Sequence, residues 1–141
     1  MARVSALPIR RALLTLAKSN PDLTALVPAA RIYPQAPPAT PAWPFIRYGS
    51  PTVSPIFGQC ANGGEITTAF HVFSKGGPDS ESAEDHAQRI AAAVEAALDK
   101  QSIDLAPGRA RVLWDGTQVL QDGDEAGAFH AIVSVRVRAL A

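Results

Sequence analysis

The sequence predicts an α+β domain whose antiparallel sheet of about four strands comes from two hairpins, with helices packed on one face. Two stretches, residues 45–75 and 111–140, are rich in β-branched and aromatic residues on both sides of a turn. Between them, residues 82–100 place apolar side chains at helical spacing, as residues 5–18 do near the start of the chain. The predicted order is therefore helix, short helix, two strands, long helix and two strands.

Length and composition fit a single domain over residues 1–141. A chain of this length buries roughly two thirds of its unfolded surface, and the 47% hydrophobic content argues against general disorder. No apolar run approaches the ~20 residues that cross a bilayer. Residues 1–19 carry arginines inside their apolar segment and lack a signal-peptide core, so we expect a cytosolic protein with no membrane partner.

The charges balance, because 13 basic residues face 13 acidic ones. Dedicated nucleic-acid binders usually carry a basic face that neutralises phosphates, whereas this chain has only short arginine clusters. Each cluster is more typical of solvated surface or of ion-pair partners than of a nucleic-acid site. The clusters are Arg10–Arg11, Arg109 with Arg111, and Arg136 with Arg138.

The helical elements carry recognisable end signals. Pro8 suits the first turn of the helix predicted over residues 5–18, and Asn20 followed by Pro21 starts a short second helix that Pro28 ends. In the long helix, Ser82 and Asp85 resemble a capping box. The apolar positions that should face inward are Ile9, Leu13, Leu16, Ala17, Leu23, Leu26 and Val27, followed by Ala83, Ala87, Ile90, Ala91, Val94, Ala97 and Leu98.

Residues 34–44 hold five of the twelve prolines. Such a stretch could be a domain linker, a ligand for a proline-binding module, or a rigid arm. The residues before it are too few to bury a core alone, which disfavours a linker. Because Tyr33, Trp43 and Phe45 resemble anchors at its two ends, we interpret it as a stiff arm that carries the chain from the helical layer into the sheet.

The strands of the first hairpin are predicted over residues 45–53 and 65–75, with a loop at 58–64. The second hairpin should run over 111–120, with a bend near Asp115–Gly116, and over 128–140. Its last strand alternates strongly. Phe129, Ala131, Val133, Val135 and Val137 lie on one face, with His130, Ile132, Ser134, Arg136 and Arg138 on the other.

Candidate catalytic and metal-binding residues are few. His71, His86 and His130 each stand alone in their motifs, although His71 and His130 lie in predicted strands and could come together. Cys60 is the single cysteine, which excludes an internal disulfide and a cysteine-based zinc site. No neighbouring base would activate it, so an unreactive loop cysteine is favoured. We therefore expect no enzyme, no catalytic residue, no cofactor and no metal.

A binding or structural role remains. Ile56 and Phe57 stand beside glycines at the predicted hairpin tip, where apolar side chains reduce solubility unless something covers them. Phe57 could fold back on its own sheet or contact a partner. Open sheet edges also invite pairing, and closed oligomers remove that problem by making the edge an interface.

The order of these motifs resembles the tail terminator (tail-completion) family of siphovirus-like phages and gene transfer agents. The likeness extends over nearly the whole chain and lies in the order and spacing of six segments. They are NPDLTALV, RIYPQAPPATPAWPFIRYG, ITTAFHVFSK, AEDHAQRIAAAVEAAL, RVLWDGTQVLQD and FHAIVSVRVRA.

The resemblance implies a structural assembly protein. Family members form a hexameric ring that caps the head-proximal end of the tail tube, stops its polymerisation and meets a neck or stopper protein, while DNA passes through without sequence-specific binding. Such a protein would be assembled in the bacterial cytoplasm and end in the tail or neck of a virion or gene-transfer-agent particle. We expect the interface to include Tyr33, Trp43, Ile56, Phe57, Gln59, Arg136 and Arg138.

Two other functions fit the same sequence. A neck adaptor or stopper would differ from a terminator in binding a portal-side protein rather than the tube protein. A small ligand-binding or enzymatic α+β domain would be a monomer or dimer with polar residues converging on a pocket.

Overall fold

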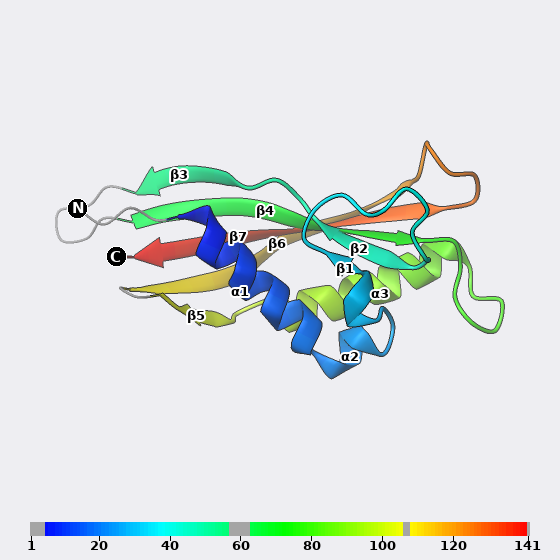
Figure 1. Ribbon diagram of the computed structural model, residues 1–141, viewed down its shortest axis with the longest axis horizontal. Coiled ribbons are helices and arrows are strands. Elements are labelled where there is room, and N and C mark those ends of the chain that lie inside the picture. Colours follow the sequence, from blue (N-terminus) through cyan, green and yellow to red (C-terminus); the bar gives the residue numbers. More distant parts are fainter. Residues whose placement is uncertain (1–4, 57–62, 106–107, 141) are drawn as a thin grey trace.

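A computed structural model describes residues 5–56, 63–105 and 108–140. These residues form three α-helices and a curled seven-stranded sheet (Figure 1). The helices are α1 (Ala6–Ser19), α2 (Pro21–Thr24) and α3 (Ala83–Leu98), with a short 3₁₀ turn at Ala29–Arg31. The strands are β1 (Ile32–Tyr33), β2 (Phe45–Tyr48), β3 (Thr52–Ile56), β4 (Gly63–Ser74), β5 (Ser102–Asp104), β6 (Arg109–Gln121) and β7 (Phe129–Leu140).

The two longest pairings hold the sheet together. Strand β7 pairs antiparallel with β4 on one side and with β6 on the other, along the full length of β4. The order across the sheet is β1-β2-β4-β7-β6-β5, and β3 lies beside β4 on the same edge as β2. Only β1 and β2 run parallel. The predicted α+β class with two antiparallel hairpins is confirmed.

One core lies between the sheet and the helices. Alternate residues of β4 and β7 are buried in the same cluster as residues from α1, α2 and α3, so the three helices cover one face of the sheet, as predicted. The alanine stripe of α3 lets the helix approach the strands closely. Fully buried core residues include Ile9, Leu13, Leu23, Ile46, Ile66, Phe70, Val72, Ile90, Val94, Val133 and Val135.

The prediction of one strand over residues 45–53 is wrong. The chain bends at Gly49–Pro51, and the two halves, β2 and β3, pair with successive parts of β4. The Gly49 N–H donates to the Ala69 carbonyl at 2.7 Å. A Cβ at position 49 would lie 3.0 Å from His71 Nε2 and 3.1 Å from the Ala69 carbonyl oxygen, so glycine fits the bend without displacing them.

The prediction of about four strands is also wrong, since the sheet has seven. Strands β1 and β5 contain only two and three residues, which is too short for an alternating pattern to appear in the sequence. Strand β3 contains Pro55. A proline in the sequence argues against a strand unless the strand lies at the edge of a sheet.

The remaining boundaries agree with the prediction to within about two residues, except that α2 ends at Thr24, before the end expected at Pro28. Ser5, Asn20 and Ser82 accept hydrogen bonds from the first turns of the three helices. The bend predicted near Asp115–Gly116 is a bulge between Trp114 and Gly116.

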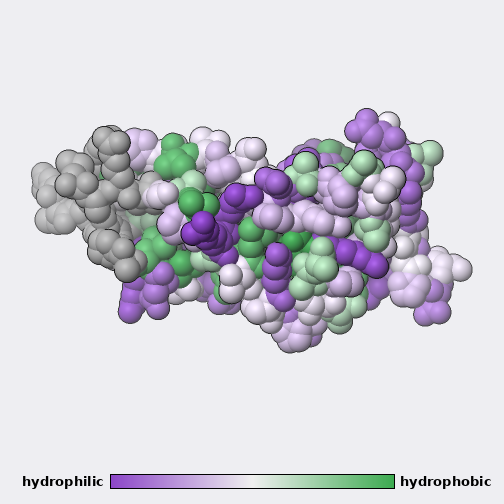
Figure 2. Space-filling view, in the orientation of Figure 1, coloured by the Kyte–Doolittle hydropathy of each residue, from purple (hydrophilic) through white to green (hydrophobic). Residues whose placement is uncertain are grey.

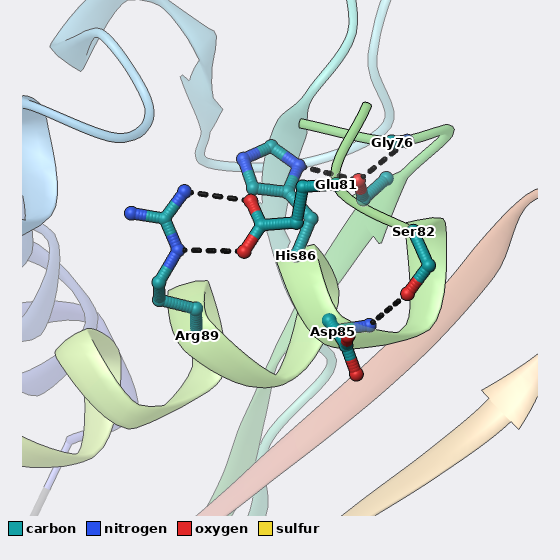
Figure 3. A network of polar contacts seen from close by, with 7 residues as sticks. Gly76, Glu81, Ser82, Asp85, His86 and Arg89 are labelled. Atoms are coloured by element: carbon teal, nitrogen blue, oxygen red, sulfur yellow. Dashed lines mark hydrogen bonds and ion pairs between the residues drawn. The ribbon is translucent and has the colours of Figure 1, made fainter. Parts of the chain in front are cut away.

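A polar network fixes the connection from β4 to α3 (Figure 3). The Ser74 hydroxyl lies 2.6 Å from His86 Nδ1 and accepts the Gly76 N–H at 3.1 Å. Arg89 donates to both carboxylate oxygens of Glu81, at 3.0 and 2.7 Å. Ser74 and His86 are buried, so this serine–histidine pair stabilises a loop and is not accessible to a substrate.

We expect Ser74→Ala to lower the free energy of unfolding by about 1–3 kcal/mol, because it leaves the buried His86 Nδ1 and Gly76 N–H without their partner. Urea unfolding followed by circular dichroism measures this. Ser54→Ala, on the exposed strand β3, is the matched control and should change stability by less than about 0.5 kcal/mol. Equal effects of the two substitutions would contradict the role of the network.

Candidate assembly surface

The sheet face that points away from the helices is the candidate assembly surface, here called the outer face. Residues of β4 and β7 on this face are half-buried or exposed, while their neighbours in sequence are buried in the core. Among the described residues, no helix covers it. Its side chains include Phe45, Arg47, Thr52, Ser54, Glu65, Thr67, Ala69, His71, Phe73, Arg111, Leu113, Gln118, Leu120, His130, Ile132, Ser134, Arg136 and Arg138.

Aromatic rings gather at one end of the outer face. Phe73 stacks between Phe45 and His130, with ring centroids 4.7 and 4.2 Å away. Trp43 packs edge-on against Phe45 at 4.9 Å, and Tyr33 does so at 6.2 Å. These five rings, the aromatic cluster, join the arm through Trp43 to strands β1, β2, β4 and β7.

The aromatic cluster confirms that both ends of the proline arm are anchored. Lys75 Nζ lies 4.6 Å from the centre of the Trp43 ring, and Arg31 Nη1 donates to the Trp43 carbonyl at 3.1 Å. The predicted anchors Tyr33, Trp43 and Phe45 thus hold the arm to the sheet. The contact of Tyr33 and Trp43 with a partner stays a prediction.

Two histidines meet beside the aromatic cluster. His71 Nδ1 and His130 Nε2 are 2.7 Å apart. The two residues are far apart in the sequence, and the predicted strands allowed them to come together. Burial, followed by the nearby Arg47 charge and His130, lowers the pKa of His71 to about 4. Burial and Arg47 also lower the pKa of His130, against the opposing effect of Asp122. The pair is therefore neutral at pH 7.

Stability should fall as the pH drops from about 6.5 towards 4, because in that window the unfolded histidines bind protons that the folded pair does not. We expect the urea midpoint of the wild-type chain to decrease over this window. His71→Phe should show a smaller decrease, although His86, whose pKa burial also lowers, still contributes. A midpoint with the same pH dependence in both proteins would contradict this assignment.

Ion pairs occupy the opposite end of the outer face. Arg136 pairs with Asp115 at 2.9 Å, and Arg138 pairs with Glu65 at 3.1 Å. The interpretation of these arginines as ion-pair partners is confirmed, and both pairs are exposed enough for each to contribute little stability. A contact of Arg136 and Arg138 with another subunit stays a prediction.

The predicted interface residues do not form one patch. Ile56 lies at the end of β3 opposite Gly63, near the ion-paired arginines, whereas Tyr33 and Trp43 lie at the other end of the sheet. Phe57 and Gln59 fall outside the described residues, as does Cys60.

A second feature, which the sequence did not reveal, is an unpaired edge on β6. The Val112 N–H donates to the Gln101 carbonyl, and the Val112 carbonyl accepts the Lys100 N–H. The Trp114 N–H donates to the Asp99 carboxylate. Beyond these contacts, residues 115–121 have no neighbouring strand on that side within the described chain. Strand β3 likewise pairs with β4 alone. These two edges expose backbone groups that another strand could pair with.

No group of three or more His, Cys, Asp or Glu side chains among the described residues could hold a metal ion. No helix of the described chain has the length and apolar character needed to span a membrane.

The fold and this surface define an α+β protein with one sheet face covered by helices, and with the other face and two edges open to contact. The chain belongs to the tail completion protein gp17 family, whose pattern matches residues 11–140, and this is a family of structural tail components. The fold is similar to that of a chain in the solved virion of a native gene transfer agent particle, with a TM-score of 0.82 and 20% sequence identity. The match covers 99% of this chain and 100% of that chain. No curated protein matches the sequence.

Proposed function

We propose that this protein is a tail terminator: a ring, most simply a hexamer, that caps the head-proximal end of the tail tube and stops its growth. The observation that carries the proposal is the family match over residues 11–140. The proposed ring would join the tube to a neck or stopper protein and leave a central opening for DNA.

Unpaired sheet edges support the ring. A ring needs two different patches on each subunit, related by a rotation that closes. Strands β3 and β6 lie on opposite sides of the sheet, so a contact that uses one edge leaves the other available to the next subunit. The outer face would then give each subunit a continuous surface for the tube or the neck.

The charge balance is compatible with DNA passing through the ring. A strongly cationic channel would hold DNA through its phosphates, whereas this chain carries equal numbers of acidic and basic residues. At the charged end of the outer face, Arg136 and Arg138 are paired with carboxylates, which reduces their attraction for phosphate.

Addition of the purified protein to polymerising tube protein tests the proposal. A terminator should bind one end of each tube and stop further growth at substoichiometric amounts, as seen by negative-stain electron microscopy. Tubes that grow to the same length with and without the protein would contradict it. Binding to a portal-side protein without any effect on tubes would indicate a neck adaptor or stopper instead.

A further inference from the structure

A hollow of about 510 Å³ opens between the start of α1, the proline arm and the bend after β2. Its lining includes Leu7, Pro34, Pro37 and Tyr48, which make an apolar floor. Hydrophobic residues reach the surface between α1 and the arm in Figure 2, with hydrophilic residues beside them. A hollow of this size accommodates a few side chains of an inserted segment.

The hollow is cationic. Two arginines, Arg10 and Arg47, contribute to its lining, and none of the described carboxylates does. The Arg10 guanidinium lies 5.8 Å from the centre of the Tyr48 ring and donates to the Pro34 carbonyl. The Arg47 guanidinium lies 5.7 Å from the centre of the Phe73 ring. Both cations are thus held in place, and an anionic segment would complement them.

The same chain exposes such a segment. The turn between β6 and β7, residues 122–128, extends beyond the sheet (orange in Figure 1). It carries three carboxylates and no basic residue. Asp122 accepts the Asp124 N–H at 3.0 Å, and Glu125 pairs with Lys75 at 2.8 Å. Asp124 is exposed and has no ion-pair partner among the described residues.

The β6–β7 turn is more acidic than the other protruding loop, residues 75–82 between β4 and α3, which holds Asp79 and Glu81 beside Lys75. In that loop, Glu81 is bound through both carboxylate oxygens by Arg89. The β6–β7 turn does not line the hollow of its own subunit, so it is available to a second copy.

We infer that the β6–β7 turn of one subunit inserts into the Arg10–Arg47 hollow of the next, with Asp124 beside the arginines. This inference rests on the proposed ring and specifies one of its subunit contacts. The two patches differ and lie on the same chain, so the contact repeats head to tail, as a closed ring requires.

Charge reversal in the whole chain tests the contact. Arg47→Glu and Asp124→Arg should each weaken self-association about tenfold or more, since each places like charges together, and the double variant should recover most of the loss. Analytical ultracentrifugation measures the association, and ¹⁵N NMR spectra show that each variant is folded. A folding defect cannot produce recovery in the double variant. Rings whose association neither single reversal changes, or a double variant no better than the singles, would overturn the inference and leave the ring intact.

If the wild-type chain is monomeric, the binding of a peptide tests the contact between the turn and the hollow. The probe is a disulfide-closed hairpin peptide that carries residues 117–131, titrated into the ¹⁵N-labelled chain. Binding should shift the amide signals of Tyr48, Gly49 and Ser50, which line the hollow. The Asp124→Arg peptide should prefer the Arg47→Glu chain. That result would support the contact and contradict a self-assembling ring, and no shift at millimolar peptide would overturn the contact.

Discussion

We expect Phe70→Ala to lower the free energy of unfolding by about 3–5 kcal/mol, the cost of emptying a buried aromatic site. Phe70 is fully buried in β4 and packs edge-on against the Tyr48 ring, with centroids 5.4 Å apart. Its neighbours come from a sheet that is hydrogen-bonded on both sides, so the cavity cannot collapse easily. Most domains are stable by only about 5–15 kcal/mol.

Thermal and urea unfolding measure this loss, which corresponds to a decrease in Tm of roughly 10–20 °C. Thr67→Ala is the matched control, because Thr67 lies on the same strand but is exposed on the outer face. It should change stability by less than about 0.5 kcal/mol. A Phe70→Ala protein that unfolds within about 1 kcal/mol of wild type would mean that the core is not packed as described.

Val119→Pro should abolish ring assembly while the subunit stays folded, if the β6 edge forms a subunit contact. The Asp122 N–H donates to the Ala128 carbonyl across the turn, so the backbone N–H of Asp122 points towards β7. In an antiparallel ladder this direction alternates, which leaves the N–H groups of Thr117, Val119 and Gln121 facing the open side. Proline at 119 removes one of these donors and places its ring in the path of an incoming strand.

Gln118→Pro is the matched control at the neighbouring position. The same alternation points the Gln118 N–H at β7, so proline there breaks the β6–β7 ladder and destabilises the subunit itself. Circular dichroism melts and native mass spectrometry of the two variants separate the effects. Rings of unchanged mass and stability from Val119→Pro would exclude the β6 edge from the interface.

Elements with repeated patterns could be predicted from the sequence. The alanine stripe of α3 and the alternation of β7 extend over several periods, and both elements lie where expected. By contrast, β1 has no period to detect. The split between β2 and β3 depends on a glycine whose packing against His71 and Ala69 is visible only in three dimensions.

The candidate surface was predictable only in part. Tyr33 and Trp43 stood out because aromatic residues flank a proline-rich stretch, and they do anchor the arm. The predicted strands allowed His71 and His130 to come together but did not give the register that places them 2.7 Å apart, and no local pattern indicated that Arg10 lies beside the arm. Part of β6 is unpaired because its neighbour β5 contains only three residues, and no sequence pattern indicated how short β5 is.

Native mass spectrometry of the purified chain at micromolar concentration tests the ring most directly. A species near six times the 14.8 kDa chain mass is the result that the proposed terminator ring predicts. A monomer or a closed dimer at every concentration, both alone and with tube protein added, would contradict it.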